Sequence, residues 1–196
     1  SNALVVNTDA TSLNPFMALG PRAWQAVRGW IRELLAEEPH RDLVEPHLVP
    51  LADVTVHMPF TVADYVDFYA SEHHARNVGA IFRPDSPNLP NAWRHLPIGY
   101  HGRAGTVVPS GTDIVRPSGL RRDGDAVTYG PSSRLDVEAE VGFVVGVPTT
   151  LGRPVPVTAF ADHVFGVVLL NDWSARDIQA FEYVPLGPFL GKSFAT

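Results

Sequence analysis

Cysteine is absent from this 196-residue sequence, which excludes disulfide bonds and thiolate metal sites and is compatible with a reducing compartment. Long apolar runs are also absent: the longest, residues 164–170, is far shorter than the roughly 20 residues that a membrane-spanning helix needs. Clusters of positive charge are missing, because the 15 lysine and arginine residues are scattered and the net charge is -6. No nucleic acid and no membrane is therefore expected as a partner, and a small-molecule substrate is more natural.

The composition is that of a folded chain. A hydrophobic content of 45% over 196 residues allows a real core, with one domain and part of a second. The first three residues, Ser1-Asn2-Ala3, resemble the scar of a cleaved expression tag, and no secretion signal is visible. The chain stops at Thr196 soon after a Pro- and Gly-rich stretch, without a terminal helix to close a core. We therefore expect a fragment of a longer protein.

Hydrophobic periodicity predicts one long helix and two strands. The helix begins at Pro21 and ends before Glu37-Glu38-Pro39, and its apolar residues at helical spacing are expected to pack in a core: Trp24, Val27, Ile31, Leu34 and Leu35. After Pro50, short apolar runs between turn residues are typical of a mostly β structure. The strongest strand signal covers residues 135–146, and a second strand is expected at 166–170 after a short helix over 159–164.

Four acidic residues in three segments are candidate metal ligands: Asp67, Glu138, Glu140 and Asp172. Glu138 and Glu140 share one face of the first strand, about 7 Å apart by strand rise, and a cation would explain why two like charges tolerate burial there. Carboxylates without cysteine suit Mg²⁺ or Ca²⁺, whereas Zn²⁺ prefers histidine or cysteine. Other interpretations stay open: a solvated glutamate face, Asp172 as a helix N-cap, and Asp67 as a turn residue.

A candidate base and candidate hydrogen-bond donors lie near these acids in the sequence. One forty-residue region contains several such residues: His73, His74, Arg83, His95, Tyr100, His101 and Arg103. A histidine beside a divalent cation and a carboxylate is a natural general base for activating water, although a single histidine is more often structural. Arg176 and Gln179 share a face if their segment is helical, and both suit a developing oxyanion. A surface helix with salt bridges, favoured by the adjacent Asp177, is the alternative.

Several segments, taken in order, resemble the fumarylacetoacetate hydrolase family. The resemblance covers nearly the whole chain and rests on these runs: SLNPFMALG, DYVDFYASEHHARNVGAIFR, PNAWRHLPIGYHGRAGTVVPSGT, LDVEAEVGFVVG and VFGVVLLNDWSARDIQAFEYVPLGPFLGKSFAT. The runs HLPIGYHGRAG and EYVPLGPFLGKSF look specific to the branch that acts on fumarylacetoacetate. This resemblance implies hydrolysis of the carbon–carbon bond of 4-fumarylacetoacetate to fumarate and acetoacetate, the last step of tyrosine and phenylalanine catabolism.

The resemblance also implies roles for individual residues. It makes the four acids ligands of a catalytic Ca²⁺ or Mg²⁺ and His74 the base that activates water. It assigns oxyanion stabilisation to Arg176, Gln179 and Lys192. Lys192 and Thr196 match positions that hold a second, structural cation near Asp172. The residues implied to contact the substrate, a β-diketo acid, are Tyr69, Arg83, Tyr100, Gln179 and Tyr183.

For the fold, the resemblance implies a mainly β structure with some α. Residues 1–50 would hold the tag scar and the end of a small SH3-like N-terminal domain, and residues 51–196 the first part of a mixed β-roll catalytic domain. The rest of that domain would supply the acid that orients the base and a substrate-binding threonine. A cytoplasmic homodimer is implied for the full-length protein. The alternatives are another superfamily member, such as an acylpyruvase or a 2-keto-4-pentenoate hydratase, or a non-catalytic metal-binding β fragment.

Overall fold

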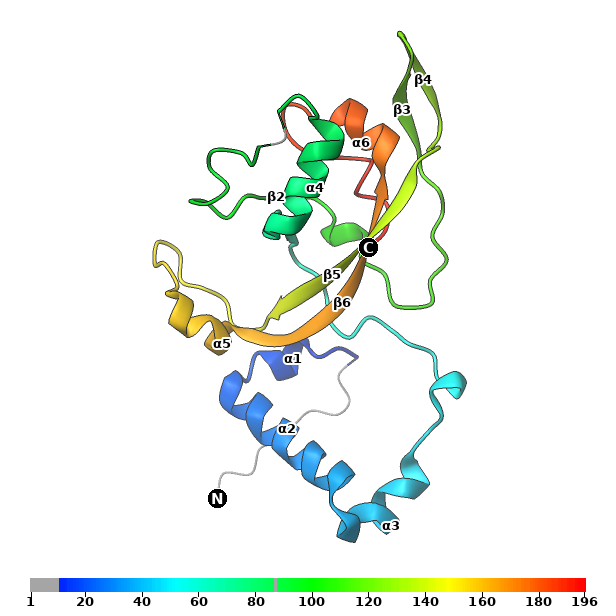
Figure 1. The fold of residues 1–196 in the computed structure, drawn as a ribbon. Coiled ribbons are helices and arrows are strands. Elements are labelled where there is room, and N and C mark those ends of the chain that lie inside the picture. The colour runs from blue at the N-terminus through cyan, green and yellow to red at the C-terminus, as the bar shows by residue number, and fades with distance from the viewer. Residues whose placement is uncertain (1–10, 87) are drawn as a thin grey trace. The chain divides into compact units, whose positions relative to one another are not determined.

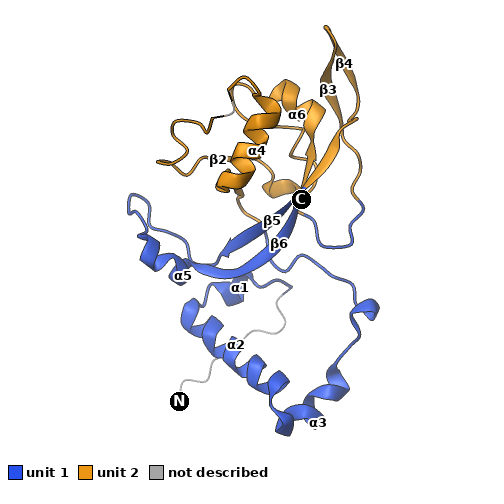
Figure 2. Cartoon of the chain, viewed as in Figure 1, with its two compact units in different colours: residues 1–61, 108–113, 138–171 blue, residues 62–107, 114–137, 172–196 orange. Residues whose placement is uncertain are grey.

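The computed structural model describes residues 11–86 and 88–196 (Figure 1). The chain forms two compact units, each built from separate stretches of sequence (Figure 2). Unit 1 comprises residues 1–61, 108–113 and 138–171, and unit 2 comprises residues 62–107, 114–137 and 172–196. The tag scar predicted at residues 1–3 lies outside the described residues. Among the helices that are described, none is both long enough and apolar enough to cross a bilayer.

The described part of unit 1 begins with helices. They are α1 (Asn14–Met17), α2 (Pro21–Ala36), η1 (Glu38–His40), α3 (Arg41–Val44), η2 (Glu45–His47) and η3 (Leu51–Asp53). The predicted long helix is confirmed as α2, and Pro21 begins it directly after Gly20, whose φ of 82° suits glycine. The structure describes no strand in residues 11–61, so the SH3-like domain stays a prediction.

Only the first half of α2 packs as predicted. Trp24 is buried, its Nε1 donates to the Met17 carbonyl oxygen at 3.0 Å, and its ring meets Phe165 edge to face at 5.2 Å. Ile31 and Leu35 are 45% and 62% exposed, so the expectation of core packing is wrong for them. α3 contacts α2, yet these two side chains stay exposed.

Strands β5 (Leu135–Val145) and β6 (Val164–Ala175) pair with each other. The 135–146 strand prediction is confirmed, and the short helix predicted before the second strand is observed as η5 (Val157–Ala159) and α5 (Phe160–His163). The second strand is longer than predicted, because Asp172 does not end it. Its side chain is fully buried and ion-paired, so extended structure continues through this polar residue to Ala175. The N-cap of the next helix is Ala175, which contradicts the capping interpretation of Asp172.

The side chains of β5 alternate as predicted, and the acidic face is the more buried one. Glu138 and Glu140 are half-buried, whereas Val141 and Phe143 are 56% and 55% exposed. Gly142 lies on the acidic face, where an added Cβ would come within 2.8 Å of Leu170. Close packing therefore extends along the face that carries the two glutamates.

Unit 2 contains two further antiparallel pairs. They are β1 (Val66–Phe68) with β2 (Gly99–His101) and β3 (Ser118–Asp123) with β4 (Ala126–Pro131). The β1–β2 register places Asp67 directly opposite Tyr100, so Asp67 is a strand residue rather than a turn residue. Gly99 permits this pairing, because a Cβ there would lie 2.7 Å from the Asp67 carbonyl oxygen.

Helices complete unit 2: α4 (Glu72–Phe82), η4 (Ala104–Thr106) and α6 (Arg176–Glu182). Ser71 caps α4 by accepting a hydrogen bond from the His74 backbone N–H at 3.3 Å. α6 packs on β3 through Ile178, which is 1% exposed and lies where a Cβ on Gly119 would come within 3.0 Å. The described structure is thus a mixture of helices and small two-stranded sheets, and the β-roll stays a prediction.

Candidate active site

A buried carboxylate, Asp172, is held between two cations in unit 2. Asp172 lies on β6 and is 0% exposed. Its Oδ1 is 2.6 Å from Nη1 of Arg103, and its Oδ2 accepts a hydrogen bond from Nζ of Lys192 at 2.7 Å. Both cations are themselves buried. Burial of three charges without such pairing would cost several kcal/mol per ion, so the triad must form as a unit.

Asp67 joins this triad from β1. Its Oδ2 accepts a hydrogen bond from the Tyr100 hydroxyl at 2.7 Å and lies 3.5 Å from Nη2 of Arg103. The same Nη2 donates to the Tyr100 oxygen at 3.2 Å. Carboxylate oxygens of Asp67 and Asp172 lie within 4.8 Å of each other. Two oxygens at that separation can share one hard cation, since Ca²⁺ and Mg²⁺ bind oxygen at about 2.0–2.6 Å.

Protonation states in this network follow from its charges. Burial, together with the negative charge and hydrogen bond of Asp67, raises the pKa of the Tyr100 hydroxyl well above its ordinary value. Tyr100 therefore remains a donor. Burial opposes the charge of Arg103, but the carboxylate of Asp172 outweighs it and the pKa of the guanidinium is raised. Arg103 is thus a permanent cation beside two aspartates.

The two glutamates lie on a different strand from the two aspartates. Glu138 and Glu140 lie on β5, which pairs with β6, the strand that carries Asp172. Both belong to unit 1, whereas Asp67 and Asp172 belong to unit 2. Their role as further ligands therefore belongs to the functional proposal.

The predicted base lies in the first turn of α4. His74 is half-buried, and its ring meets the ring of Tyr69 edge to face at 5.9 Å. Tyr69 is itself fixed, since its hydroxyl donates to the Ala75 carbonyl oxygen at 2.9 Å and its own carbonyl accepts from Trp93 Nε1 at 2.7 Å. The neighbouring His73 is exposed. The structure therefore gives His74 the more ordered setting of the two.

The two predicted oxyanion donors on α6 are in contact. Nη1 of Arg176 donates to Oε1 of Gln179 at 3.1 Å, which confirms that they share a helical face. Because the amide oxygen of Gln179 accepts this bond, its NH₂ group is the part that can donate to another group. Nε of Arg176 also bonds Oδ2 of Asp136 at 2.8 Å, so the surface salt bridge considered as an alternative exists too.

Lys192 is positioned by the loop that follows α6. Oε1 of Glu182 accepts hydrogen bonds from the backbone N–H groups of Phe189 at 2.8 Å and Gly191 at 2.6 Å. Gly191 lies so close to α6 that a Cβ would come within 2.7 Å of the Gln179 nitrogen. Glu182 therefore fixes the loop from which Lys192 reaches Asp172.

The roles predicted for the remaining site residues are not tested by the structure. Oγ1 of Thr196 accepts a hydrogen bond from Arg103 at 3.0 Å, and the ammonium group of Lys192 carries donors only. Their assignment to a second cation stays a prediction. At Lys192 the backbone carbonyl oxygen, and not the side chain, would be the ligand. Arg83 is exposed at the end of α4, and Tyr183 is 40% exposed at the end of α6. Their substrate contacts likewise stay predictions.

Arg103 is a residue that the sequence marked only as a general hydrogen-bond donor, without a specific role. It is one of several polar residues in the region 73–103. Nothing in the sequence shows that its side chain is 0% exposed. Only the structure singles it out, because the buried carboxylate of Asp172 requires a cation and Arg103 is one of the two that meet it.

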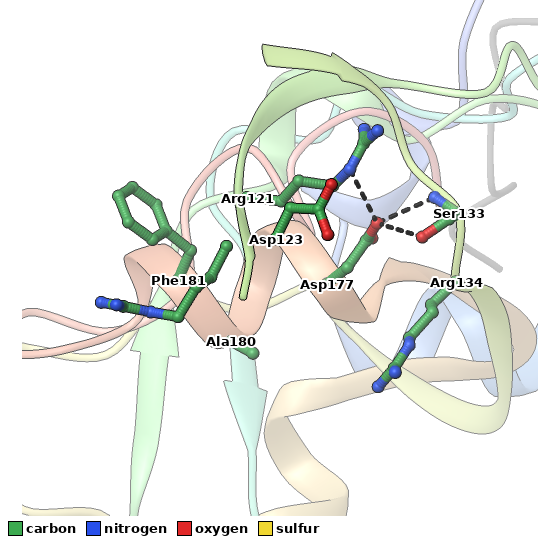
Figure 3. A pocket seen from close by; sticks show the side chains of 8 residues that line it. Arg121, Asp123, Ser133, Arg134, Asp177, Ala180 and Phe181 are labelled. Carbon is green, nitrogen blue, oxygen red and sulfur yellow. Dashed lines mark hydrogen bonds and ion pairs between the residues drawn. The ribbon is translucent and has the colours of Figure 1, made fainter. Parts of the chain in front are cut away.

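A second polar cluster is centred on Asp177, a residue of α6 (Figure 3). Oδ1 of Asp177 accepts from the Ser132 hydroxyl at 2.5 Å, and its Oδ2 accepts from the Ser133 backbone N–H at 2.8 Å and hydroxyl at 2.9 Å. A hollow beside it is lined by Arg121, Arg122 and Arg134 among others, and by none of the predicted site residues. In Figure 3 the guanidinium groups of Arg121 and Arg134 point apart, so they do not converge on a common ligand.

Asp177 makes a testable contribution to acid stability. Burial would raise its pKa, but the hydrogen bonds from Ser132 and Ser133 outweigh this and lower the pKa to about 2. A folded-state pKa below the unfolded value means that the contribution is present above about pH 4 and is lost as the pH falls towards 2. We expect Asp177→Asn to lower the free energy of unfolding by about 2 kcal/mol at neutral pH, with the difference shrinking between pH 5 and 3.

Urea unfolding at several pH values measures this difference. Asp123→Asn, which removes an exposed carboxylate from the β3–β4 hairpin, is the matched control and should change stability less. A difference between Asp177→Asn and the unaltered protein that stays constant from pH 7 to pH 3 would contradict the assignment.

Comparison with known proteins decides the family. The family model described as "Fumarylacetoacetate (FAA) hydrolase C-terminal" matches residues 64–196, and the model "Fumarylacetoacetase N-terminal" matches residues 3–59. The chain belongs to the fumarylacetoacetate hydrolase family. The resemblance inferred from its sequence runs is therefore confirmed, as is the prediction of an enzyme family of the hydrolase class.

Several curated relatives are similar over almost the whole chain. Fumarylacetoacetase of Rattus norvegicus is 50% identical over 196 residues, which cover 96% of this chain and 46% of the relative. Fumarylacetoacetase of Homo sapiens is 48% identical over 192 residues, or 94% of this chain and 46% of the relative. The protein of the same name from Arabidopsis thaliana is 50% identical over 193 residues. The chain spans about half the length of the curated relatives it matches.

Proposed function

We propose that the protein hydrolyses the carbon–carbon bond of 4-fumarylacetoacetate to fumarate and acetoacetate, the last step of tyrosine and phenylalanine catabolism. The observation that carries this proposal is the buried network of Asp67, Tyr100, Arg103, Asp172 and Lys192. It occurs in a chain about half identical to proteins named fumarylacetoacetase. We place the intact enzyme in the cytoplasm as a homodimer, with an SH3-like domain ending near residue 50 and a β-roll catalytic domain from residue 51.

The donor set fits Mg²⁺ or Ca²⁺. Asp67 and Asp172 offer oxygens within 4.8 Å of each other, and we propose Glu138 and Glu140 as the other two ligands. All four donors are carboxylates, which hard cations prefer, and the absence of cysteine disfavours softer metals. When bound, such a cation supplies Lewis-acid polarisation of substrate oxygens.

The hydrolytic step follows from His74. Its imidazole takes a proton from water, and the resulting hydroxide oxygen forms a bond to the ketone carbon of the fumaryl group, which becomes the new carboxylate carbon of fumarate. The carbon–carbon bond then breaks, and its electron pair stays with the acetoacetate fragment, whose carbon takes up a proton. Water is the only co-reactant. The half-buried position of His74 beside the fixed ring of Tyr69 supports this role, because a base must be held in one orientation.

Donors from α6 and the following loop would stabilise the negative charge that develops on the ketone oxygen. Arg176, Gln179 and Lys192 supply these donors, and the Arg176–Gln179 bond presents the amide NH₂ as a donor. We propose that substrate is held by the side chains named from the resemblance: Tyr69, Arg83, Tyr100, Gln179 and Tyr183. The hydroxyl groups of the tyrosines and the charge of Arg83 suit a substrate with carboxylate and keto oxygens.

Turnover by the intact protein tests the proposal. We expect Mg²⁺-dependent loss of the ultraviolet absorbance of fumarylacetoacetate, abolished by a chelator and restored by added Mg²⁺ or Ca²⁺. Glu140→Gln removes one charged ligand and should weaken cation binding strongly, with activity lost at the same cation concentration. Calorimetry measures the affinity, and Glu45→Gln serves as a control that removes the charge of an exposed glutamate outside the ligand set.

Two results would contradict the proposal. Unchanged cation affinity in Glu140→Gln would remove Glu140 from the ligand set. Hydrolysis of an acylpyruvate, or hydration of 2-keto-4-pentenoate, without turnover of fumarylacetoacetate would move the protein to another branch of the superfamily.

A further inference from the structure

The indole N–H of Trp93 is bonded to the residue whose ring faces the proposed base. Its Nε1 donates to the carbonyl oxygen of Tyr69 at 2.7 Å, and the ring of Tyr69 meets the imidazole of His74 edge to face at 5.9 Å. Trp93 and Tyr69 are both half-buried, so water competes with this bond only in part. Indole has one polar hydrogen and no acceptor, so its whole hydrogen-bonding capacity is directed at Tyr69.

The segment that carries Trp93 holds Tyr69 at two backbone atoms. The backbone N–H of Trp93 donates to the Pro90 carbonyl oxygen at 2.9 Å, which closes a turn and orders the indole. Further along the same segment, the Ile98 carbonyl oxygen accepts the backbone N–H of Tyr69 at 2.9 Å. That bond continues the pairing of β1 with β2 beyond Phe68. Both the N–H and the C=O of Tyr69 are therefore fixed by residues 93–98.

Tyr69 transmits this constraint to α4. Its hydroxyl donates to the Ala75 carbonyl oxygen at 2.9 Å, so its side chain is fixed as well as its backbone. Ala75 follows His74 directly and is only 1% exposed, which places the bond in a tightly packed turn of the helix. The ring of Tyr69 is thus a fixed surface beside the imidazole of His74. A base depends on such a surface, because misplacement by about 1 Å can cost about a hundredfold in rate.

We infer that Trp93 is a positioning residue for the base: its indole N–H fixes Tyr69, and Tyr69 in turn fixes the imidazole of His74. This inference rests on the proposed function, because it takes His74 as the base. Trp93 is outside the residues proposed to touch the cation, the substrate or the reacting water. Loss of its N–H should therefore lower kcat and leave the affinity for the cation unchanged.

Two variants of Trp93 separate the hydrogen bond from the bulk of the ring. Trp93→Phe keeps an aromatic ring and removes the donor. Trp93→His restores a donor, because the five-membered rings of indole and imidazole superpose with Nε2–H in the place of Nε1–H. Steady-state kinetics on the intact protein should show kcat lowered about tenfold or more in Trp93→Phe and within about threefold of the unaltered value in Trp93→His. Calorimetry should show Ca²⁺ affinity close to that of the unaltered protein in both variants.

Trp24→Phe is the matched control. Trp24 is also a tryptophan whose Nε1 donates to a backbone carbonyl oxygen, that of Met17 at 3.0 Å, and its ring contacts Phe165. None of these three residues has a proposed role in the reaction. Both Phe variants should lose stability in urea unfolding, because each loses one such bond, and only Trp93→Phe should lose kcat. A purely structural role of Trp93 would not separate the two variants in this way.

A double-mutant cycle tests whether Trp93 acts through the base. In the His74→Ala background no imidazole is left to be positioned, so adding Trp93→Phe should lower the residual rate by less than about twofold. The same loss of rate in both backgrounds would show that Trp93 acts by another route and would overturn the inference. Unaltered kcat in Trp93→Phe, or a kcat in Trp93→His no higher than in Trp93→Phe, would overturn it as well.

The position of the His74 ring can also be measured without turnover. Its Hε1 resonance is identified by its absence from the NMR spectrum of His74→Ala, and the adjacent Tyr69 ring gives it a ring-current shift. This shift should decrease in Trp93→Phe and stay in place in Trp24→Phe and Trp93→His. If Trp93→Phe does not fold, Trp93→His alone tests the role, because loss of both kcat and the shift in that variant would overturn it.

Failure of the proposed function gives different results. An intact, unaltered protein that does not turn over fumarylacetoacetate overturns the proposed function, and the His74 resonance then tests the positioning role by itself. A fully active His74→Ala variant overturns the proposed base, and the role of Trp93 with it. Turnover that depends on His74, with full activity and an unchanged His74 resonance in Trp93→Phe, overturns the role of Trp93 alone.

Discussion

His74→Ala is expected to remove most hydrolysis by the intact enzyme, by about 10²- to 10⁴-fold, while leaving the cation bound. The imidazole is proposed to act on water and is not a ligand, so its loss affects the reaction step and not the carboxylate site. Its ordered place against the ring of Tyr69 is what distinguishes it from its neighbour. Steady-state kinetics and calorimetry on the same sample measure the two effects separately.

His73→Ala is the matched control, because His73 is the exposed member of the pair in the same helical turn. It should retain activity close to that of the unaltered enzyme. Full activity in His74→Ala, together with a large loss in His73→Ala, would move the base to His73. A loss of cation affinity in His74→Ala would instead make His74 part of the metal site.

Asp172→Asn is expected to destabilise the fold and abolish cation binding. The change leaves Arg103 and Lys192 buried beside a neutral amide, and breaking a buried ion pair from one side typically costs about 3–5 kcal/mol. Asparagine keeps nearly the same shape, so the loss reports charge rather than packing. Denaturant unfolding in the presence of a chelator measures the free-energy change without a contribution from bound cation.

Asp136→Asn provides the control for charge removal. The carboxylate of Asp136 is 52% exposed and pairs with Arg176, so its loss should cost no more than about 1 kcal/mol. Equal destabilisation by the two variants would show that the buried triad contributes no more than a surface salt bridge. The prediction would then be wrong.

The sequence predicted best those elements whose pattern is local. Helical spacing after Pro21 located α2, and strict alternation located β5, because both periods are dictated by backbone geometry. The end of β6 was mispredicted, since a polar residue normally ends a buried strand unless a distant partner neutralises it. Asp172 has such partners in Arg103 and Lys192, which lie far from it along the chain.

The same distinction between local and long-range information applies to the candidate site. Residue type alone marked the acids and His74, because carboxylates and imidazole have recognisable chemistry wherever they occur. The burial of Arg103 depends on Asp67, Asp172 and Thr196 meeting in three dimensions, and a single sequence carries no record of that encounter. Sequence reasoning therefore found the candidate ligands and missed the buried arginine that meets two of them.

The Arg103–Thr196 bond has a consequence for how the protein folds. It joins residues 93 positions apart, and Thr196 also donates its backbone N–H to the Thr106 carbonyl oxygen at 3.0 Å. Contacts between such distant segments require a long loop to close before any interaction energy is returned, so they form late. During synthesis the network around Arg103 stays incomplete until residue 196 has left the ribosome. Until then Arg103 lacks one of its hydrogen-bond partners, so the network can be completed only after the segment that contains Thr196 has been synthesised.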